Sequence, residues 1–269
     1  MTIVDLGSGP PVVIVPGIQG RWEWLRPAVQ ALARECRVIT FSLADEPSCR
    51  GRFDEARGFS AYVEQVEEAM DTLGIRRAVI CGVSYGGLIA AAFAARHADR
   101  VSGLVLISAI PPSWQPDARV RFYLRAPVLL SPLFCVASLR LYREIAAAAG
   151  SRRQGIATAI AHGWNAVTHM FSPSRMARRV HLLRGERLAQ ALAAVSVPTL
   201  VITGDAGLDR VVPVTATHEY VKMWPHAETA TLARTGHLGS ITRPDEFARI
   251  VTRFALAASD QEENRRHVV

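Results

Sequence analysis

Short apolar runs alternate with longer segments of helical character along most of the 269-residue chain. The short runs are rich in β-branched residues and are bounded by turn-forming residues, which is typical of buried strands. They predict strands at residues 12–15, 37–42, 78–81, 101–108, 197–203 and 229–233.

The segments between these runs have apolar residues at helical spacing or are rich in alanine. They predict helices at residues 27–35, 60–73, 85–96, 215–223 and 244–257, and Gly74 suits the C-terminal cap of the second. Continuously apolar strands that alternate with helices indicate a parallel sheet covered on both faces. The pattern therefore predicts an α/β protein with a doubly wound, mostly parallel sheet.

The alternation stops after Ile110 and resumes near residue 197. The intervening stretch has no strand signal and is helical, with many arginines and alanines. We expect one core domain formed by residues 1–111 and 197–258, a helical cap inserted at 112–196, and a mobile polar tail at 259–269.

Residues 122–142 are apolar enough to raise the question of a membrane span. Arg125, Arg140, two prolines and the lack of about 18 uninterrupted apolar residues argue against stable insertion. The stretch is better interpreted as a buried or substrate-facing helix.

The net charge of +7 and the pI of about 9.8 raise the question of an anionic partner. The chain has no run of five or more Lys or Arg and no nucleic-acid motif, so the excess is interpreted as a solvated basic face. Attraction to anionic lipid or an acidic substrate is the second interpretation.

Two further features concern location and cysteine chemistry. Residues 1–11 lack the basic and apolar regions of a signal peptide, which predicts a cytoplasmic protein. The four cysteines are far apart and form no C-x-x-C pair, so we expect reduced, structural thiols rather than disulfides or metal ligands. They are Cys36, Cys49, Cys81 and Cys135.

The sequence Gly82-Val83-Ser84-Tyr85-Gly86 matches G-x-S-x-G and lies between a predicted strand and a predicted helix. A nucleophile at the tip of a strand needs a sharp, strained turn, and flanking glycines let the strand and the helix pack closely. The alternative is an ordinary glycine-rich turn. The strand and helix around it favour Ser84 as a nucleophile.

Of eight histidines, His237 has the position that a catalytic base requires, in the loop after the last predicted strand. An acid is expected after the strand at 197–203, where Asp205 and Asp209 compete. Asp209 lies deeper in the loop and is preferred, while Asp205 is expected to brace a turn.

The loop that follows the first predicted strand, Pro16-Gly17-Ile18-Gln19-Gly20, is suited to an oxyanion hole. Two backbone N–H groups are needed there, and we expect them from Ile18 and Tyr85. Neither of the common glycine-rich nucleotide motifs is present, which argues against a nucleotide site.

Together, the segments PGIQG, GVSYGG, GLDRVVP and TGHLGSITRPDEF resemble the α/β-hydrolase superfamily, in its esterase-like branch with a helical cap. The resemblance covers the core segments, and the 112–196 segment matches only in position and helical character. It implies an eight-stranded sheet with the cap inserted after the sixth strand. Pro16 stands where many relatives have histidine, and the family's first strand is expected to be missing or short.

These residues predict a serine hydrolase that cleaves a small, apolar ester through an acyl-enzyme, with no metal or organic cofactor. A thioesterase, lactonase, C–C bond hydrolase or perhydrolase remains open, as does a hydrolase-fold binding protein with little turnover. The oligomeric state is left open.

Trp24, near the oxyanion loop, is a candidate for the substrate pocket. Candidate substrate-pocket residues, with core packing as the alternative, are Gln19, Trp22, Trp164, Met170 and Phe171.

Overall fold

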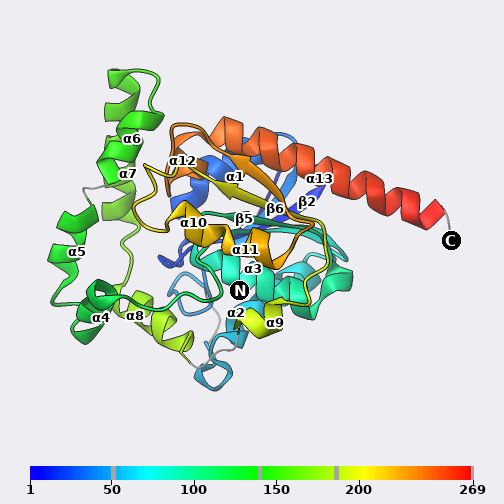
Figure 1. Cartoon of the computed structure of the whole chain (residues 1–269), viewed down its shortest axis with the longest axis horizontal. Helices are drawn as coiled ribbons and strands as arrows, with labels where there is room; N and C mark the ends of the chain where they lie inside the picture. Colours follow the sequence, from blue (N-terminus) through cyan, green and yellow to red (C-terminus); the bar gives the residue numbers. More distant parts are fainter. Residues whose placement is uncertain (50–52, 139–140, 185–187, 268–269) are drawn as a thin grey trace.

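The computed structural model describes residues 1–49, 53–138, 141–184 and 188–267, and its centre is one seven-stranded sheet (Figure 1). The strand order is β1-β3-β2-β4-β5-β6-β7, and every neighbouring pair is parallel except β1 and β3. The strands are β1 (Ile3–Leu6), β2 (Pro11–Val15), β3 (Arg37–Phe41), β4 (Ala78–Val83), β5 (Val101–Ile107), β6 (Thr199–Thr203) and β7 (Glu228–Thr231).

Helices cover both faces of the sheet, because successive residues of a buried strand point to opposite sides. On β2, Val13 and Val15 face a core shared with α2 and α3, whereas Val12 and Ile14 face a core shared with α1 and α13. The core helices are α1 (Arg26–Leu32), α2 (Ser60–Thr72), α3 (Tyr85–Arg96), α10 (Val214–Thr217), α11 (Glu219–Met223), α12 (Gly239–Thr242) and α13 (Pro244–His267), with short 3-10 helices η1 (Trp22–Leu25), η2 (Glu55–Arg57) and η3 (Ala98–Arg100).

This arrangement confirms the predicted fold class, and each of the six predicted strands is present within a few residues of its expected bounds. The predicted helix at 215–223 is two short helices, α10 and α11. The sheet has seven strands where the resemblance implied eight, and the helical insertion follows the fifth strand of the chain, β5, instead of the sixth. The reason is that the ten residues before β2 form one strand, β1, and a turn with positive φ at Gly7 and Gly9.

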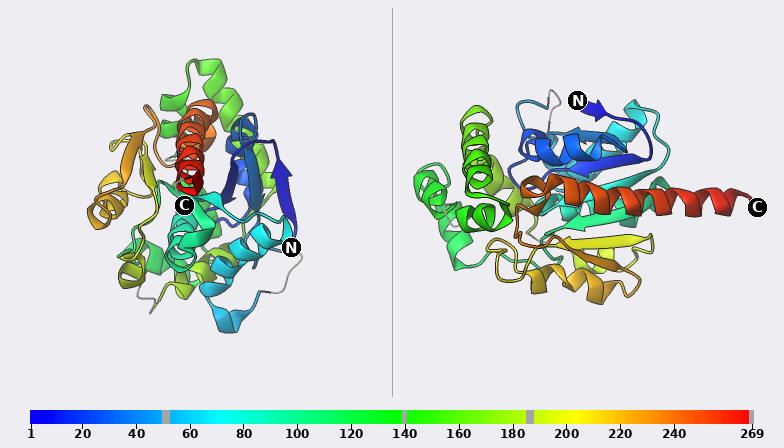
Figure 2. Two further views of the ribbon diagram at one scale, coloured as in Figure 1. Left: turned by 90° about the vertical axis from the view of Figure 1, so that its right-hand side faces the viewer. Right: turned by 90° about the horizontal axis from the view of Figure 1, so that it is seen from above.

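In the described part of the stretch between β5 and β6 there are six α-helices, all within residues 112–196, which we term the inserted segment. They are α4 (Ala118–Arg125), α5 (Ser131–Ser138), α6 (Tyr142–Ala148), α7 (Arg152–Thr168), α8 (Pro173–Leu182) and α9 (Leu188–Leu192). Helices α4 to α7 form one end of the molecule, away from the C-terminal end of α13 (Figures 1 and 2). The last helix, α9, packs on α3, and its Leu188 and Leu192 belong to the main core.

The C-terminal segment differs from the expected tail. Residues 259–267 continue helix α13, which projects beyond the ends of the strands (Figure 2). No glycine or proline interrupts the chain after Pro244, so nothing in the sequence ends the helix earlier. Among the residues that the structure describes, no helix is both long and apolar enough to cross a membrane.

The cysteines whose side chains are described, Cys36, Cys49 and Cys81, are buried, and the side chain of Cys135 lies outside the described residues.

The order of the strands creates a topological switch point at the carboxyl ends of β2 and β4. From β2 the chain crosses to β3 on one side, whereas β4 lies on the other side and leads on to β5. The loops after β2 and β4 therefore diverge at this topological switch point, where open α/β sheets bind their ligands. Pro16–Gly20 and Ser84 lie in these two loops.

Candidate active site

Ser84 lies in a sharp turn between β4 and α3. Its φ of 53° and ψ of −115° are uncommon for a residue with a side chain, and they lift the serine out of the line of the strand. A Cβ at Gly86 would lie 2.4 Å from the Val15 carbonyl oxygen, and one at Gly82 would lie 2.4 Å from that of Gly86. Glycine is thus required at both positions for strand and helix to meet so closely.

His237 comes from the loop between β7 and α12, and its ring reaches Ser84 across 153 positions of sequence. Its Nε2 lies 3.0 Å from Ser84 Oγ, within hydrogen-bond distance. The Ser84 residue is only 8% exposed. The hydroxyl and the imidazole therefore meet in a site largely shielded from water.

The second ring nitrogen of His237, Nδ1, hydrogen-bonds to Asp209 and not to Asp205. His237 Nδ1 lies 3.2 Å from Asp209 Oδ2, and Asp209 Oδ1 accepts from the N–H groups of Val211 and Val212. Asp205 instead accepts from the backbone N–H of Arg234 at 2.7 Å and so braces the same loop from outside.

The charge on Asp209 is favoured by its surroundings. Burial opposes ionisation, but the hydrogen bond and charge of His237, together with the N–H groups of Val212 and Val211, outweigh burial and lower the pKa of Asp209. An ionised carboxylate there favours the imidazole tautomer with its proton on Nδ1, which leaves Nε2 free to accept from Ser84.

The loop after β2 passes directly beside the serine. A Cβ built on Gly17 would lie 3.5 Å from the Cβ of Ser84 and 3.4 Å from the Gln19 side-chain oxygen. The backbone of Ile18, the next residue, is therefore close to Ser84, and Tyr85 is the first residue of α3. The two residues predicted to supply oxyanion N–H groups are thus both near the nucleophile candidate.

Arg179 of α8 contacts this loop, and its role was not predicted from the sequence. Its guanidinium donates to the Ile18 carbonyl at 2.6 Å, to Asp45 at 2.6 Å and 3.1 Å, and to Glu46 at 2.6 Å. The side chains of Arg179 and Asp45 are fully buried, and that of Glu46 is 1% exposed. One buried charge cluster therefore ties the inserted segment to the loop beside Ser84. Nothing local in an arginine-rich helix marks which arginine is buried.

Replacing Arg179 with methionine is expected to destabilise the protein by roughly 3–5 kcal/mol, because two buried carboxylates lose their cation. Arg178→Met is the matched control, since Arg178 is 43% exposed and pairs with Glu55 at 3.5 Å. This control is expected to change the free energy of unfolding by less than about 1 kcal/mol. Urea unfolding followed by circular dichroism measures both values, and equal losses would contradict the buried-cluster interpretation.

Glu144 of α6 is a second contact between the inserted segment and the site, and it too was missed from sequence. The residue is 1% exposed, and its carboxylate accepts from the backbone N–H of Leu238, next to His237. Burial raises the pKa of Glu144 to about 7; the Leu238 N–H, the His237 charge and the Gly236 N–H oppose this, and the Asp209 charge adds to it. A proton on this carboxyl is therefore retained up to near-neutral pH.

This raised pKa predicts a pH-dependent stability. The folded protein keeps the Glu144 proton up to about pH 7, whereas an unfolded glutamate loses it near its usual pKa of 4.5. The contribution of Glu144 to the free energy of unfolding is full below about pH 4.5 and is lost as the pH rises through 7, a change of roughly 3 kcal/mol. Glu144→Gln, which keeps an acceptor for Leu238, is expected to remove this decline.

Unfolding in urea at several pH values measures the effect. Glu68→Gln, at a side chain 61% exposed, is the control and is expected to follow the wild-type pH profile. A Glu144→Gln profile parallel to that of the wild type would show that this carboxyl does not titrate as described.

Some of the predicted pocket residues lie near the loops of the site, whereas others are exposed to solvent. Gln19 lies beside Gly17, and Trp22 packs under Arg26, whose guanidinium carbon is 5.4 Å from the ring centroid. Trp24 donates to the His169 carbonyl at 3.2 Å, and its ring lies 6.2 Å from that of Phe171.

Trp164 and Met170 face solvent, each with 70% of its surface exposed, so the structure does not enclose them in a pocket with Ser84. Trp164 is on α7 at four-residue spacing from the exposed Ile160, so the two side chains share a solvent-exposed face of the helix. Its apolar character suggested a pocket, but its position on the outer side of α7 puts it at the surface.

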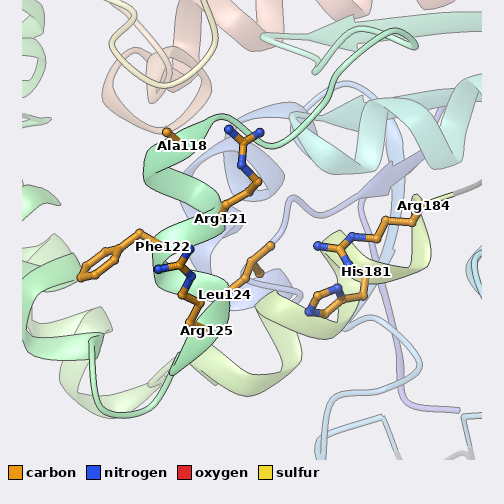
Figure 3. A pocket seen from close by; sticks show the side chains of 7 residues that line it. All are labelled: Ala118, Arg121, Phe122, Leu124, Arg125, His181 and Arg184. Carbon is orange, nitrogen blue, oxygen red and sulfur yellow. The ribbon is translucent and has the colours of Figure 1, made fainter.

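No cluster of three or more His, Cys, Asp or Glu side chains suited to hold a metal ion occurs within the described part of the chain. A cavity of about 600 Å³ lies between α4 and α8, apart from the residues around Ser84 (Figure 3). The side chains that line it include Arg121, Arg125, His181 and Arg184.

Comparison with known proteins places the chain in a family. The model of the alpha/beta hydrolase family matches residues 12–250, most of the chain. The chain therefore belongs to the alpha/beta hydrolase family and is a hydrolase. This assignment agrees with the resemblance found in the sequence.

The similar proteins differ in what their names describe. The chain is 26% identical to a protein of Rhizobium rhizogenes named "Putative carbamate hydrolase RutD", over 96% of this chain and 97% of that one. It is 30% identical to the 2-hydroxymuconate semialdehyde hydrolase of Pseudomonas putida, over 83% and 76% of the two chains. The crystal structure of an enol-lactonase from Burkholderia xenovorans LB400 superimposes with a TM-score of 0.75 at 22% identity, over 94% and 95%, which shows a shared fold.

Proposed function

We propose that this hydrolase cleaves an ester bond through an acyl-enzyme, as carboxylesterases do, with Ser84 as the nucleophile. The observation that carries the proposal is the continuous chain from Ser84 Oγ through the His237 ring to Asp209, with distances of 3.0 Å and 3.2 Å. This arrangement provides a nucleophile, a base and a group that orients the base.

The first half of the reaction forms the acyl-enzyme. His237 Nε2 takes the proton of Ser84 Oγ as the oxygen attacks the carbonyl carbon of the ester. The carbonyl oxygen becomes an oxyanion that accepts from the backbone N–H groups of Ile18 and Tyr85. When the carbonyl re-forms, the bond to the alcohol breaks and His237 returns its proton to the departing oxygen.

The second half releases the acid. A water molecule donates a proton to His237 Nε2 and attacks the acyl carbon. The resulting oxyanion accepts hydrogen bonds from the same two backbone N–H groups. Collapse breaks the bond to Ser84 Oγ, which recovers the proton from His237. Asp209, kept ionised by its lowered pKa, stabilises the imidazolium in both halves.

The inserted segment acts as a cap that selects the substrate. Ser84 is nearly buried, Glu144 of α6 contacts the His237 loop, and Arg179 of α8 contacts the Ile18 loop. A substrate must therefore pass between the inserted segment and the core to reach the serine. Half-buried aromatic residues such as Trp24 and Phe171, where these two parts meet, favour a small, apolar ester.

A panel of substrates tests the proposal. Initial rates are measured on p-nitrophenyl esters from acetyl to decanoyl, and on a thioester, a lactone, an aryl carbamate and a vinylogous 1,5-diketone. We expect the highest kcat/KM on one of the simple esters. If a substrate of another class had a kcat/KM more than about tenfold higher than that of the best simple ester, the ester assignment would be refuted.

A further inference from the structure

The inserted segment accounts for the net positive charge of the whole protein. It contains 12 arginines and 3 acidic residues, a net charge of +9 at pH 7, whereas the chain as a whole has +7. The remaining residues therefore have a net charge of −2. The basic pI does not describe a uniformly basic surface, because its source is one part of the fold.

The same segment also exposes most of the large apolar side chains at the surface. Within the described residues, ten of the thirteen large hydrophobic side chains that are exposed lie between Phe122 and Met170. Val128 and Leu129, in the turn between α4 and α5, are 65% and 79% exposed. Soluble proteins rarely expose so many apolar side chains in one region unless the region binds something.

The exposed apolar side chains follow the outer faces of helices. On α7, Ile156, Ile160 and Trp164 are spaced four residues apart, which places them on one face, and they are 45%, 67% and 70% exposed. On α5, Leu133 and Val136 are spaced three apart and are 49% and 62% exposed. These helices and α4 lie at the end of the molecule opposite to the tip of α13 (Figure 2).

Arginines lie close to this apolar surface. Arg121 and Arg125 are exposed on α4, and with His181 and Arg184 of the α8 region they line the cavity between the two helices (Figure 3). None of the described side chains that line this cavity is acidic. Guanidinium groups bind phosphate oxygens well, and the cavity can hold an anionic headgroup.

We propose that the inserted segment docks on the surface of a bilayer that contains anionic phospholipid. The exposed apolar side chains enter the interface between headgroups and acyl chains, as those of amphipathic helices do, and the arginines contact the lipid phosphates. A second copy of the chain is a poorer occupant, because two surfaces of charge +9 repel each other. Nucleic acid would leave the apolar side chains without a partner.

Docking in this way is peripheral. No described helix can span a bilayer, so binding depends on the apolar side chains together with the charge. Because Glu144 and Arg179 connect the inserted segment to the loops at Ser84, docking brings the site to the membrane surface. The docking proposal does not depend on the proposed ester cleavage, and binding is therefore measured with the full-length Ser84→Ala variant as well as with wild type.

Sedimentation with sucrose-loaded vesicles tests the proposal. The full-length protein is expected to sediment with an equal mixture of phosphatidylcholine and phosphatidylglycerol, at least about tenfold more tightly than with phosphatidylcholine alone. Binding is expected to weaken as salt is raised, because salt screens surface charge. Failure to sediment with the anionic vesicles at low salt would overturn the proposal.

Two matched sets of variants identify the face that binds. Arg121→Glu with Arg125→Glu is expected to reduce the affinity for anionic vesicles at least about tenfold. Arg249→Glu with Arg253→Glu makes the same change of charge at the same spacing on α13 and is expected to leave the affinity within about twofold. Equal losses of vesicle affinity from the two pairs would mean that only the net charge matters. Such a result would overturn the assignment of the docking face to the inserted segment.

The apolar contribution is tested in the same assay. Val128→Ser with Leu129→Ser is expected to weaken vesicle binding, whereas Leu256→Ser, at an exposed position on α13, is the control that retains it. Size-exclusion chromatography measures the size of the same variants. A wild-type dimer that Val128→Ser with Leu129→Ser converts to a monomer, without any vesicle binding, would assign this face to a second copy and overturn the lipid proposal.

Discussion

Ser84→Ala is expected to lower kcat on the best p-nitrophenyl ester by on the order of 10⁴- to 10⁶-fold, because the substitution removes the atom that attacks the carbonyl. The variant is also expected to lose covalent labelling by a fluorophosphonate, which mass spectrometry of the intact protein detects. The fold is expected to remain, since Gly82 and Gly86 form the close contact between β4 and α3.

Ser108→Ala is the matched control for this experiment. Ser108 is 2% exposed, has a φ of 41° and directly follows β5, the neighbour of β4 in the sheet. It therefore shares the burial and the unusual backbone conformation of Ser84 without its contact to His237. This control is expected to keep its labelling, and a folded Ser84→Ala protein that labels at the wild-type rate would refute the nucleophile assignment.

Asp209→Asn is expected to lower kcat by on the order of 10⁴-fold, because an amide no longer favours the imidazole tautomer that accepts from Ser84. The charge that stabilises the imidazolium is lost as well. The distance of 3.2 Å from His237 Nδ1 to Asp209 Oδ2 is the basis for this expectation. Steady-state rates with the wild-type enzyme's best ester measure it.

Asp205→Asn tests the same assignment from the other side. Asp205 accepts from the backbone N–H of Arg234, whereas the His237 ring contacts Asp209, so this change is expected to cost about 1 kcal/mol of stability and to alter kcat only a few-fold. If Asp205→Asn proved the more damaging to kcat, the acid would be misassigned.

Much of the core was predictable because short, continuous apolar runs bounded by turn residues indicate buried strands. The six strand predictions agree with β2 to β7 because buried parallel strands require continuous apolar runs, and few other structures do. β1 was missed because its four residues, Ile3–Leu6, are only half-buried or exposed and pair along one edge with β3. The continuation of α13 to His267 was missed because a polar segment without glycine or proline fits a helix and a tail equally well.

The site shows the same division. Ser84 and His237 were chosen for their positions directly after predicted strands, and they meet at 3.0 Å. The choice between Asp209 and Asp205 depended on how a loop folds back, which the backbone contacts of Val211, Val212 and Arg234 now describe. Arg179 and Glu144 had no local signature, because each is separated in sequence by more than 90 residues from the loop that it contacts.

The α/β class, the order of the core elements and the position of the G-x-S-x-G turn followed from local patterns, because periodicity and glycine spacing act over a few residues. The folded chain was needed to tell which aspartate contacts His237, which charged residues of the inserted segment are buried, and which apolar ones face solvent. Those outcomes depend on long-range packing, where burial of a charge is tolerated only when a distant partner compensates for the loss of water.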